Sequence, residues 1–155
     1  EIPFVASGGM ADARSLVAAM ALGAEGMNMG TRFIATKDAP VHQNVKDAIV
    51  NASELDTRLI MRSLTNTERV LNNPAVESLI AKEKALGDDL TFEDIVDEVA
   101  GVYPKVMMEG EPEVGAWSCG MVAGLVNDIP SVEELINTIM KEAEEIIASK
   151  LQKAI

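Results

Sequence analysis

The sequence predicts an α/β fold, because two short apolar segments that end in glycine flank one helix-forming segment. The first apolar run covers 3–6 and leads directly into Ser7-Gly8-Gly9, as expected of a strand buried on both faces. The segment 11–22 holds strong helix formers and is followed by a glycine, a common helix stop. The second strand covers 25–29 and ends at Gly30. Two short strands joined by one helix predict parallel pairing and a right-handed crossover.

The rest of the chain continues this mixed pattern with helices predominating. The expected elements are, in order, a helical turn over 32–36, a helix over about 42–52, an extended segment over 57–61, and helices over 75–86 and 92–100. Gly87 and Gly101 follow the last two of these, and Thr91 with Asp94 predicts a cap for the second.

The last helix has the clearest signals in the sequence. It follows Pro130, and Ser131 with Glu134 matches a capping box. Its apolar face, opposite an acidic side, consists of Val132, Leu135, Ile136, Ile139, Ala143, Ile146 and Ile147. This pattern predicts a helix that packs along one side of the protein.

Composition limits the classes of partner. The 155 residues include 25 acidic and 13 basic side chains, for a formal charge of −12, which disfavours nucleic acid and anionic membranes. One cysteine, Cys119, excludes an internal disulfide framework and fits a reducing cytoplasm, the expected location. Neither a transmembrane run of about 18 apolar residues nor a signal peptide is expected. The chain starts directly in a strand, so we expect that its natural beginning is missing.

The two glycine turns predict an anion site. Two glycines after a strand let a ligand touch the backbone, and the following helix directs N–H groups to the same place. Gly30-Thr31 repeats this arrangement, with the Thr31 hydroxyl as a further donor. Two adjacent strand ends that present amides match the common barrel phosphate site after strands seven and eight. For one Gly-Gly alone, a tight turn without a ligand is an equally good interpretation.

Several blocks of sequence resemble the nitronate monooxygenase family, formerly called 2-nitropropane dioxygenases. They are, in order, Ala6-Ser7-Gly8-Gly9, the run from Gly23 to Phe33, the run from Ile60 to Thr67, Trp117-Ser118-Cys119-Gly120-Met121, Gly124-Leu125 and Asp128-Ile129-Pro130. The resemblance covers essentially the whole chain, but only the C-terminal half of such a protein. It implies part of a (β/α)8 TIM barrel, its last two βα units, with a helical insertion. It also implies non-covalent FMN and the oxidation of alkyl nitronates by O2.

The resemblance assigns roles to individual residues. Gly8, Gly9, Gly30 and Thr31 match the FMN-phosphate positions. Ser7, Asn28 and Met29 flank them and are expected at the same end of the pocket, so all seven residues are cofactor-binding candidates. Trp117 and Ser118 match a segment that reaches the flavin and substrate cavity.

No catalytic residue is assigned, because the family's histidine loop belongs to an earlier strand that this chain lacks. The single histidine, His42, begins a helix and is interpreted as a structural or capping residue. Cys119 has no neighbouring basic residue to lower its pKa and is interpreted as buried and inert. The acidic pairs lack partners at metal-ligand spacing, so no metal site is expected, and the nine methionines are interpreted as core residues.

Three cations lie near the expected phosphate site. Arg14, Arg32 and Lys37 are candidates for its counter-charge. Arg32 has a second interpretation, a salt bridge beneath the barrel helices, and the sequence does not choose between them.

The predicted organisation has three parts. Residues 1–56 hold barrel strands seven and eight with their helices, 57–115 form a mainly helical insertion, and 116–155 return to cover the barrel with the last helix. The predicted function is FMN-dependent nitronate oxidation on a small-molecule substrate, with an FMN-dependent enoyl-acyl-carrier-protein reductase as the alternative. A non-catalytic, phosphate-binding half-barrel is an alternative of another class, because a half-barrel needs a second copy or a missing N-terminal half to cover its exposed edges.

Overall fold

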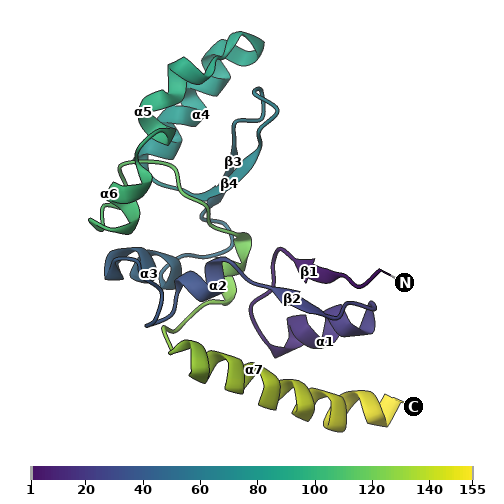
Figure 1. Cartoon of the computed structure of the whole chain (residues 1–155). Coiled ribbons are helices and arrows are strands. Elements are labelled where there is room, and N and C mark those ends of the chain that lie inside the picture. Colours follow the sequence, from purple (N-terminus) through teal and green to yellow (C-terminus); the bar gives the residue numbers. More distant parts are fainter. Residues whose placement is uncertain (1, 155) are drawn as a thin grey trace.

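The first part of the chain forms a βαβ unit. The computed structural model describes residues 2–154, and in it β1 (Val5–Ser7) and β2 (Gly26–Asn28) pair in parallel (Figure 1). The helix α1 (Ala13–Ala21) connects them. The α/β class and the parallel pairing predicted from the sequence are therefore confirmed.

Local capping sets the limits of α1. The side chain of Asp12 accepts a hydrogen bond from the backbone N–H of Ser15 at 3.0 Å and begins the helix. Gly23 lies just beyond its end with φ of 94°, a conformation that favours glycine.

The prediction that the first strand is buried on both faces is wrong. Phe4 and Val5 are 50% and 56% exposed. Within residues 2–154, β2 is the only strand that pairs with β1, so one edge and much of the surface of β1 meet solvent. An apolar strand is buried only where neighbouring elements cover it, and the described part of the chain supplies few.

Two short helices follow β2. Helix α2 (Thr31–Ile34) is a single turn, and α3 (Gln43–Val50) begins at His42. Both lie where the sequence predicts helical structure.

The middle of the chain contains an antiparallel hairpin that the sequence only half predicted. Strand β3 (Thr57–Ile60) was expected, but its partner β4 (Glu68–Leu71) was not. β4 has four residues, of which two are charged, so its alternation is too short to distinguish it from a loop. Val70 also forms an isolated antiparallel bridge with Ser118, which extends this small sheet.

The helices that follow the hairpin lie above α3 in Figure 1, the first two beside the hairpin and the last close to α3. They are α4 (Pro74–Leu86), α5 (Val96–Val99) and α6 (Tyr103–Met107), with 3-10 turns at Gly87–Asp89 and Phe92–Ile95. The continuous helix expected over 92–100 is wrong, because Ile95, with φ of −118° and ψ of 8°, separates the capped 3-10 turn from α5. The capping box of Thr91 and Asp94 is confirmed, while α6 had no clear signal in the sequence.

The last part returns to the first. A 3-10 helix, η3 (Met121–Leu125), precedes α7 (Val132–Ile146), which continues into a π-helical turn (Ile147–Leu151) and a 3-10 turn (Gln152–Ala154). The capping box of Ser131 and Glu134 is confirmed. Helix α7 lies along α1, and Figure 1 shows the two side by side below the small parallel sheet.

Three apolar clusters hold these parts together. One joins Ala13 and Val17 of α1 to Ala143 of α7. A second cluster lies between the hairpin and α4. The largest cluster surrounds Trp117 and includes residues of α3. No helix among residues 2–154 is long and apolar enough to cross a membrane.

Candidate functional site

The two predicted strand ends lie side by side. Ser7 and Asn28 are opposite each other in the parallel register, and Asn28 Nδ2 donates a hydrogen bond to Ser7 Oγ at 3.2 Å. Because parallel strands end at the same edge, the turns that follow both strands start from this pair.

The turn after β1 exposes its backbone. Gly8 and Gly9 have φ of 89° and 72°, and no other atom lies within 4 Å of the position that a Cβ would occupy on either. Asp12 caps α1 through Ser15, so the available surface of this turn is the glycine backbone rather than the start of the helix. A ligand is therefore able to approach this backbone closely.

The turn after β2 has one exposed residue, Gly30, and one buried, hydrogen-bonded residue, Thr31. Gly30 is exposed and has free space around its Cβ position, whereas Thr31 is buried. The Thr31 hydroxyl accepts a hydrogen bond from the backbone N–H of Gly120 at 2.9 Å. Met29 is half-buried between the strand and this turn.

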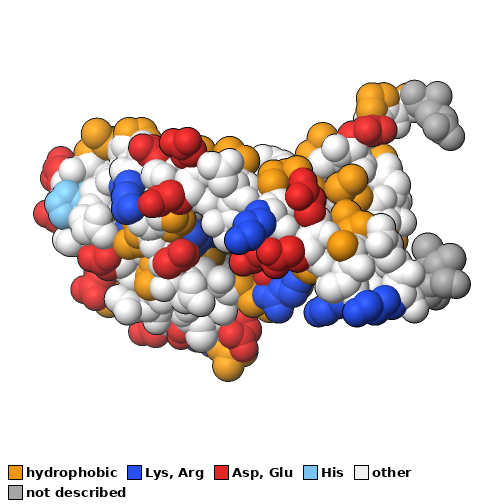
Figure 2. All heavy atoms as spheres, turned by 90° about the horizontal axis from the view of Figure 1, so that it is seen from below, with side chains coloured by type: hydrophobic (Ala, Val, Ile, Leu, Met, Phe, Trp, Pro, Cys, Tyr) orange, Lys and Arg blue, Asp and Glu red, His pale blue; other side chains and the backbone are white. Residues whose placement is uncertain are grey.

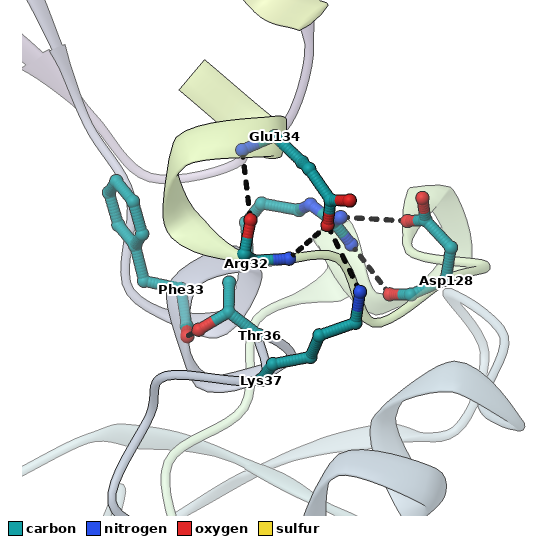
Figure 3. Close-up of polar contacts among 7 residues, drawn as sticks. Arg32, Phe33, Thr36, Lys37, Asp128 and Glu134 are labelled. Carbon is teal, nitrogen blue, oxygen red and sulfur yellow. Dashed lines mark hydrogen bonds and ion pairs between the residues drawn. The ribbon is translucent and has the colours of Figure 1, made fainter. Parts of the chain in front are cut away.

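The three candidate counter-charges are all in ion pairs. Arg32 is buried and donates to the backbone oxygen of Asp128 at 3.1 Å and to its carboxylate at 2.7 Å (Figure 3). Lys37 pairs with Glu134 at 3.1 Å, and Arg14 pairs with Asp12. Arg32 therefore forms a salt bridge, as one of its two interpretations predicts, and the place of this pair beneath barrel helices stays a prediction.

The two candidate cavity residues have different environments. Trp117 is fully buried, and its indole N–H donates to the Pro112 carbonyl at 2.9 Å. Ser118 is exposed at the edge of β4, where its hydroxyl donates to the Glu68 carboxylate. Their role in a substrate cavity stays a prediction.

Cys119 and His42 have the structural roles expected. Burial raises the pKa of the Cys119 thiol to about 11, while a hydrogen bond with Thr31 opposes this shift. His42 caps α3, with its Nδ1 accepting from the backbone N–H of Asn44 at 3.1 Å. No group of three metal-ligating side chains gathers among residues 2–154.

Shallow hollows border the second turn. One, of about 310 Å³, includes Gly30 and Phe33 in its wall. It shares Ile34 and Val41 with a more apolar hollow of about 400 Å³ that reaches α6. The sequence predicted neither hollow, because each joins segments that are far apart in the chain.

The fold and the site define an α/β protein with open glycine turns at one end of a parallel strand pair. The chain belongs to the nitronate monooxygenase family, whose model matches residues 1–142. It is 36% identical to a probable nitronate monooxygenase of Staphylococcus aureus (strain JH9), over 96% of this chain and 41% of that protein. Enzymes of this family are FMN-dependent oxidoreductases.

Two solved structures of enzymes are similar to this chain over its whole length or nearly so. FabK from Thermotoga maritima superposes with a TM-score of 0.90 and 35% identity, over all of this chain and 48% of that one. A nitroalkane oxidase from Streptomyces ansochromogenes gives a TM-score of 0.73 at 20% identity, over 96% of this chain and 41% of that one, which shows a shared fold. These neighbours are TIM-barrel enzymes. The chain spans about half the length of the relatives it matches.

Proposed function

We propose that this chain supplies the FMN-phosphate site and one wall of the substrate cavity of a nitronate monooxygenase. The observation that carries the proposal is the parallel pairing of β1 with β2, which brings two open glycine turns to one edge. In this proposal residues 1–56 are barrel strands seven and eight, 57–115 the insertion, and 116–155 the covering segment.

Backbone amides are the expected phosphate ligands. The net charge of −12 repels anions in general, and the nearby cations are held in ion pairs, so local dipoles must provide the attraction. Gly8 and Gly9 fit a phosphate because nothing occupies the space above their backbone, and Gly30 fits for the same reason. Thr31 contributes its amide in this arrangement, because its side chain is buried against Gly120. Ser7, Asn28 and Met29 line the same end.

The chemistry is divided between the cofactor and the protein. FMN supplies the redox chemistry when bound, with an alkyl nitronate as the reductant and O2 as the oxidant. The residues of this chain hold and orient the cofactor, and Trp117 and Ser118 belong to the segment expected beside the substrate. The family's catalytic histidine has no counterpart here, so the chain alone is expected to show negligible turnover.

A second candidate is an FMN-dependent enoyl-acyl-carrier-protein reductase. The superposition with FabK, which is such a reductase, supports it, because its 35% identity over the whole chain is close to the 36% identity with a probable nitronate monooxygenase. This enzyme would use NAD(P)H and an enoyl thioester, and the phosphate site proposed above would serve it equally.

A third candidate is a half-barrel that depends on a partner. The exposed edge and apolar residues of β1 support it. The partner would be a second copy of the chain or the N-terminal half found in the relatives.

FMN binding to the purified chain tests the proposal. Folding is checked first by circular dichroism, and FMN is then titrated while its fluorescence is followed. We expect binding at micromolar FMN, and a folded chain that takes up none contradicts the proposed site. Oxygen uptake with an alkyl nitronate and NAD(P)H oxidation with an enoyl thioester are measured in parallel. Robust nitronate turnover by this chain would show that the missing histidine loop is dispensable, and thioester-dependent turnover would favour the reductase.

A further inference from the structure

Two adjacent polar residues of the one-turn helix α2 are buried. Thr31 and Arg32 are only 8% and 4% exposed, although arginine is rarely buried without a partner. Both belong to the turn that begins at Gly30, and both are bonded to the same distant part of the chain. Their burial therefore results from contacts between two segments rather than from the helix itself.

Arg32 makes two hydrogen bonds to one residue, Asp128. Its guanidinium donates to the Asp128 carbonyl through Nη1 and to the Asp128 carboxylate through Nη2 (Figure 3). A buried cation is stable only when it is paired and hydrogen-bonded, so this geometry is strongly preferred over alternatives. The nearby pair of Lys37 and Glu134 joins the same two segments, but both of its side chains are about 60% exposed. Such an exposed pair contributes little.

The partners of Thr31 and Arg32 lie on either side of the 3-10 helix η3 in the sequence. Thr31 holds Gly120, immediately before η3, and Arg32 holds Asp128, three residues after its end. The segment that follows Trp117 and Ser118 is thus attached at two points to the helix that begins beside Gly30. A shift of this segment would move the backbone of Gly30 and Thr31.

We propose that Arg32 is a positioning residue of the FMN-phosphate site, acting through Asp128 and not through contact with the phosphate. This inference rests on the proposed function. Hydrogen bonds from backbone amides weaken steeply when their angle changes, so a phosphate held at Gly30 and Thr31 depends on a fixed α2. The Arg32 charge is neutralised by Asp128, which leaves the amides as the phosphate donors.

Comparison of FMN with riboflavin provides the test, because riboflavin has the same ring system and lacks the phosphate. Dissociation constants for both are measured with the wild-type chain and with Arg32→Lys, Arg32→Met and Asp128→Asn. We expect the variants to bind FMN about tenfold more weakly and riboflavin unchanged, since a charged hydrogen bond contributes roughly this much. Lys37→Gln, which removes the exposed pair between the same segments, is the matched control and should leave both constants unchanged.

The alternatives give different results. If Arg32 were the counter-charge of the phosphate, Asp128→Asn would release it and strengthen FMN binding, which would overturn the proposal. An equal loss of affinity for FMN and riboflavin would show a merely structural role and would also overturn the proposal. Variants that bind FMN as tightly as the wild-type chain would overturn it as well. If Arg32→Met fails to fold, Asp128→Asn still decides, because that side chain is largely exposed. A folded wild-type chain that binds neither flavin refutes the proposed function itself, and the positioning role with it.

Discussion

Thr31 and Gly120, 89 residues apart, are joined by a hydrogen bond of 2.9 Å from the glycine N–H to the threonine hydroxyl. This bond attaches the return segment to the turn at the end of β2. A Cβ on Gly120 would lie 3.5 Å from the same oxygen, which is an ordinary van der Waals distance, so the space at Gly120 does not itself require glycine.

Replacement of Thr31 should destabilise the fold through this bond. Thr31→Val keeps the shape but removes the acceptor of the part-buried Gly120 N–H, and we expect a loss of about 1 kcal/mol in the free energy of unfolding. Thr31→Ser keeps the hydroxyl, so its free energy of unfolding should fall by less than that of Thr31→Val. Urea denaturation of both variants measures the difference, and equal stabilities would show that the hydrogen bond contributes nothing.

Gly9→Val should abolish FMN binding. The φ of 72° at Gly9 lies in the left-handed region, where a side chain costs roughly 1–2 kcal/mol, and the new side chain would cover the open backbone. Gly87→Val is the matched control, because Gly87 also has positive φ and free space but lies at the end of α4. Both variants should lose stability in thermal unfolding, and only Gly9→Val should lose affinity in FMN titration. Equal FMN affinity in the two variants would contradict a phosphate site at Gly9.

Local signals in the sequence predicted much of the fold. The capping boxes at Thr91 and Ser131, the helix stop at Gly23 and the glycine turn after β1 each depend on a few neighbouring residues, and all are present. The exposure of Val5 was missed because burial depends on neighbours that the described chain does not supply. β4 was missed because a four-residue strand has no distinctive period.

The sequence predicted only those parts of the candidate site that lie within the βαβ unit. Ser7 and Asn28 were expected to meet because parallel strands end together, and they do. The partners of Thr31 and Arg32 lie 89 and 96 residues away, and no spacing within one sequence pairs such residues. The alternatives for Arg32 could therefore be separated only by the structure.

Cys119 should be unreactive in the folded chain. It is buried, and burial raises the pKa of its thiol to about 11, so little thiolate forms at pH 8. Ellman's reagent should label it slowly under native conditions and rapidly in denaturant. Fast, complete labelling of the native chain would show that this region opens readily.

Glu134 should make stability depend on pH in the acid range. Hydrogen bonds from Ser131, together with the Lys37 ammonium, lower the pKa of Glu134 from 4.5 to about 2. Because the folded-state pKa is lowered, its stabilisation is complete above about pH 4.5 and is lost as the pH falls toward 2. The difference in melting temperature between wild type and Glu134→Gln should therefore shrink over this range. A constant difference down to pH 2 would show that the carboxylate is not the stabilising form.

The exposed surface of β1 should cause self-association of the isolated chain. Ile2, Phe4 and Val5 are each at least half exposed, and β1 has an edge without a partner in the described chain. Figure 2 shows hydrophobic side chains exposed toward the end of the molecule that carries the termini. Unpaired edges and apolar patches of this kind favour association between chains.

Removing this apolar surface tests the prediction directly. Phe4→Ser combined with Val5→Thr keeps the β propensity at position 5 while lowering the hydrophobicity, so the parallel pairing with Gly26 should persist. Light scattering after size-exclusion chromatography should show a smaller mass for the double variant at the same concentration. Leu55→Ser, at a more exposed apolar residue before the hairpin, is the control and should leave the mass unchanged. If wild type is already monomeric at high concentration, the β1 surface is tolerated in water and the half-barrel needs no partner to remain soluble.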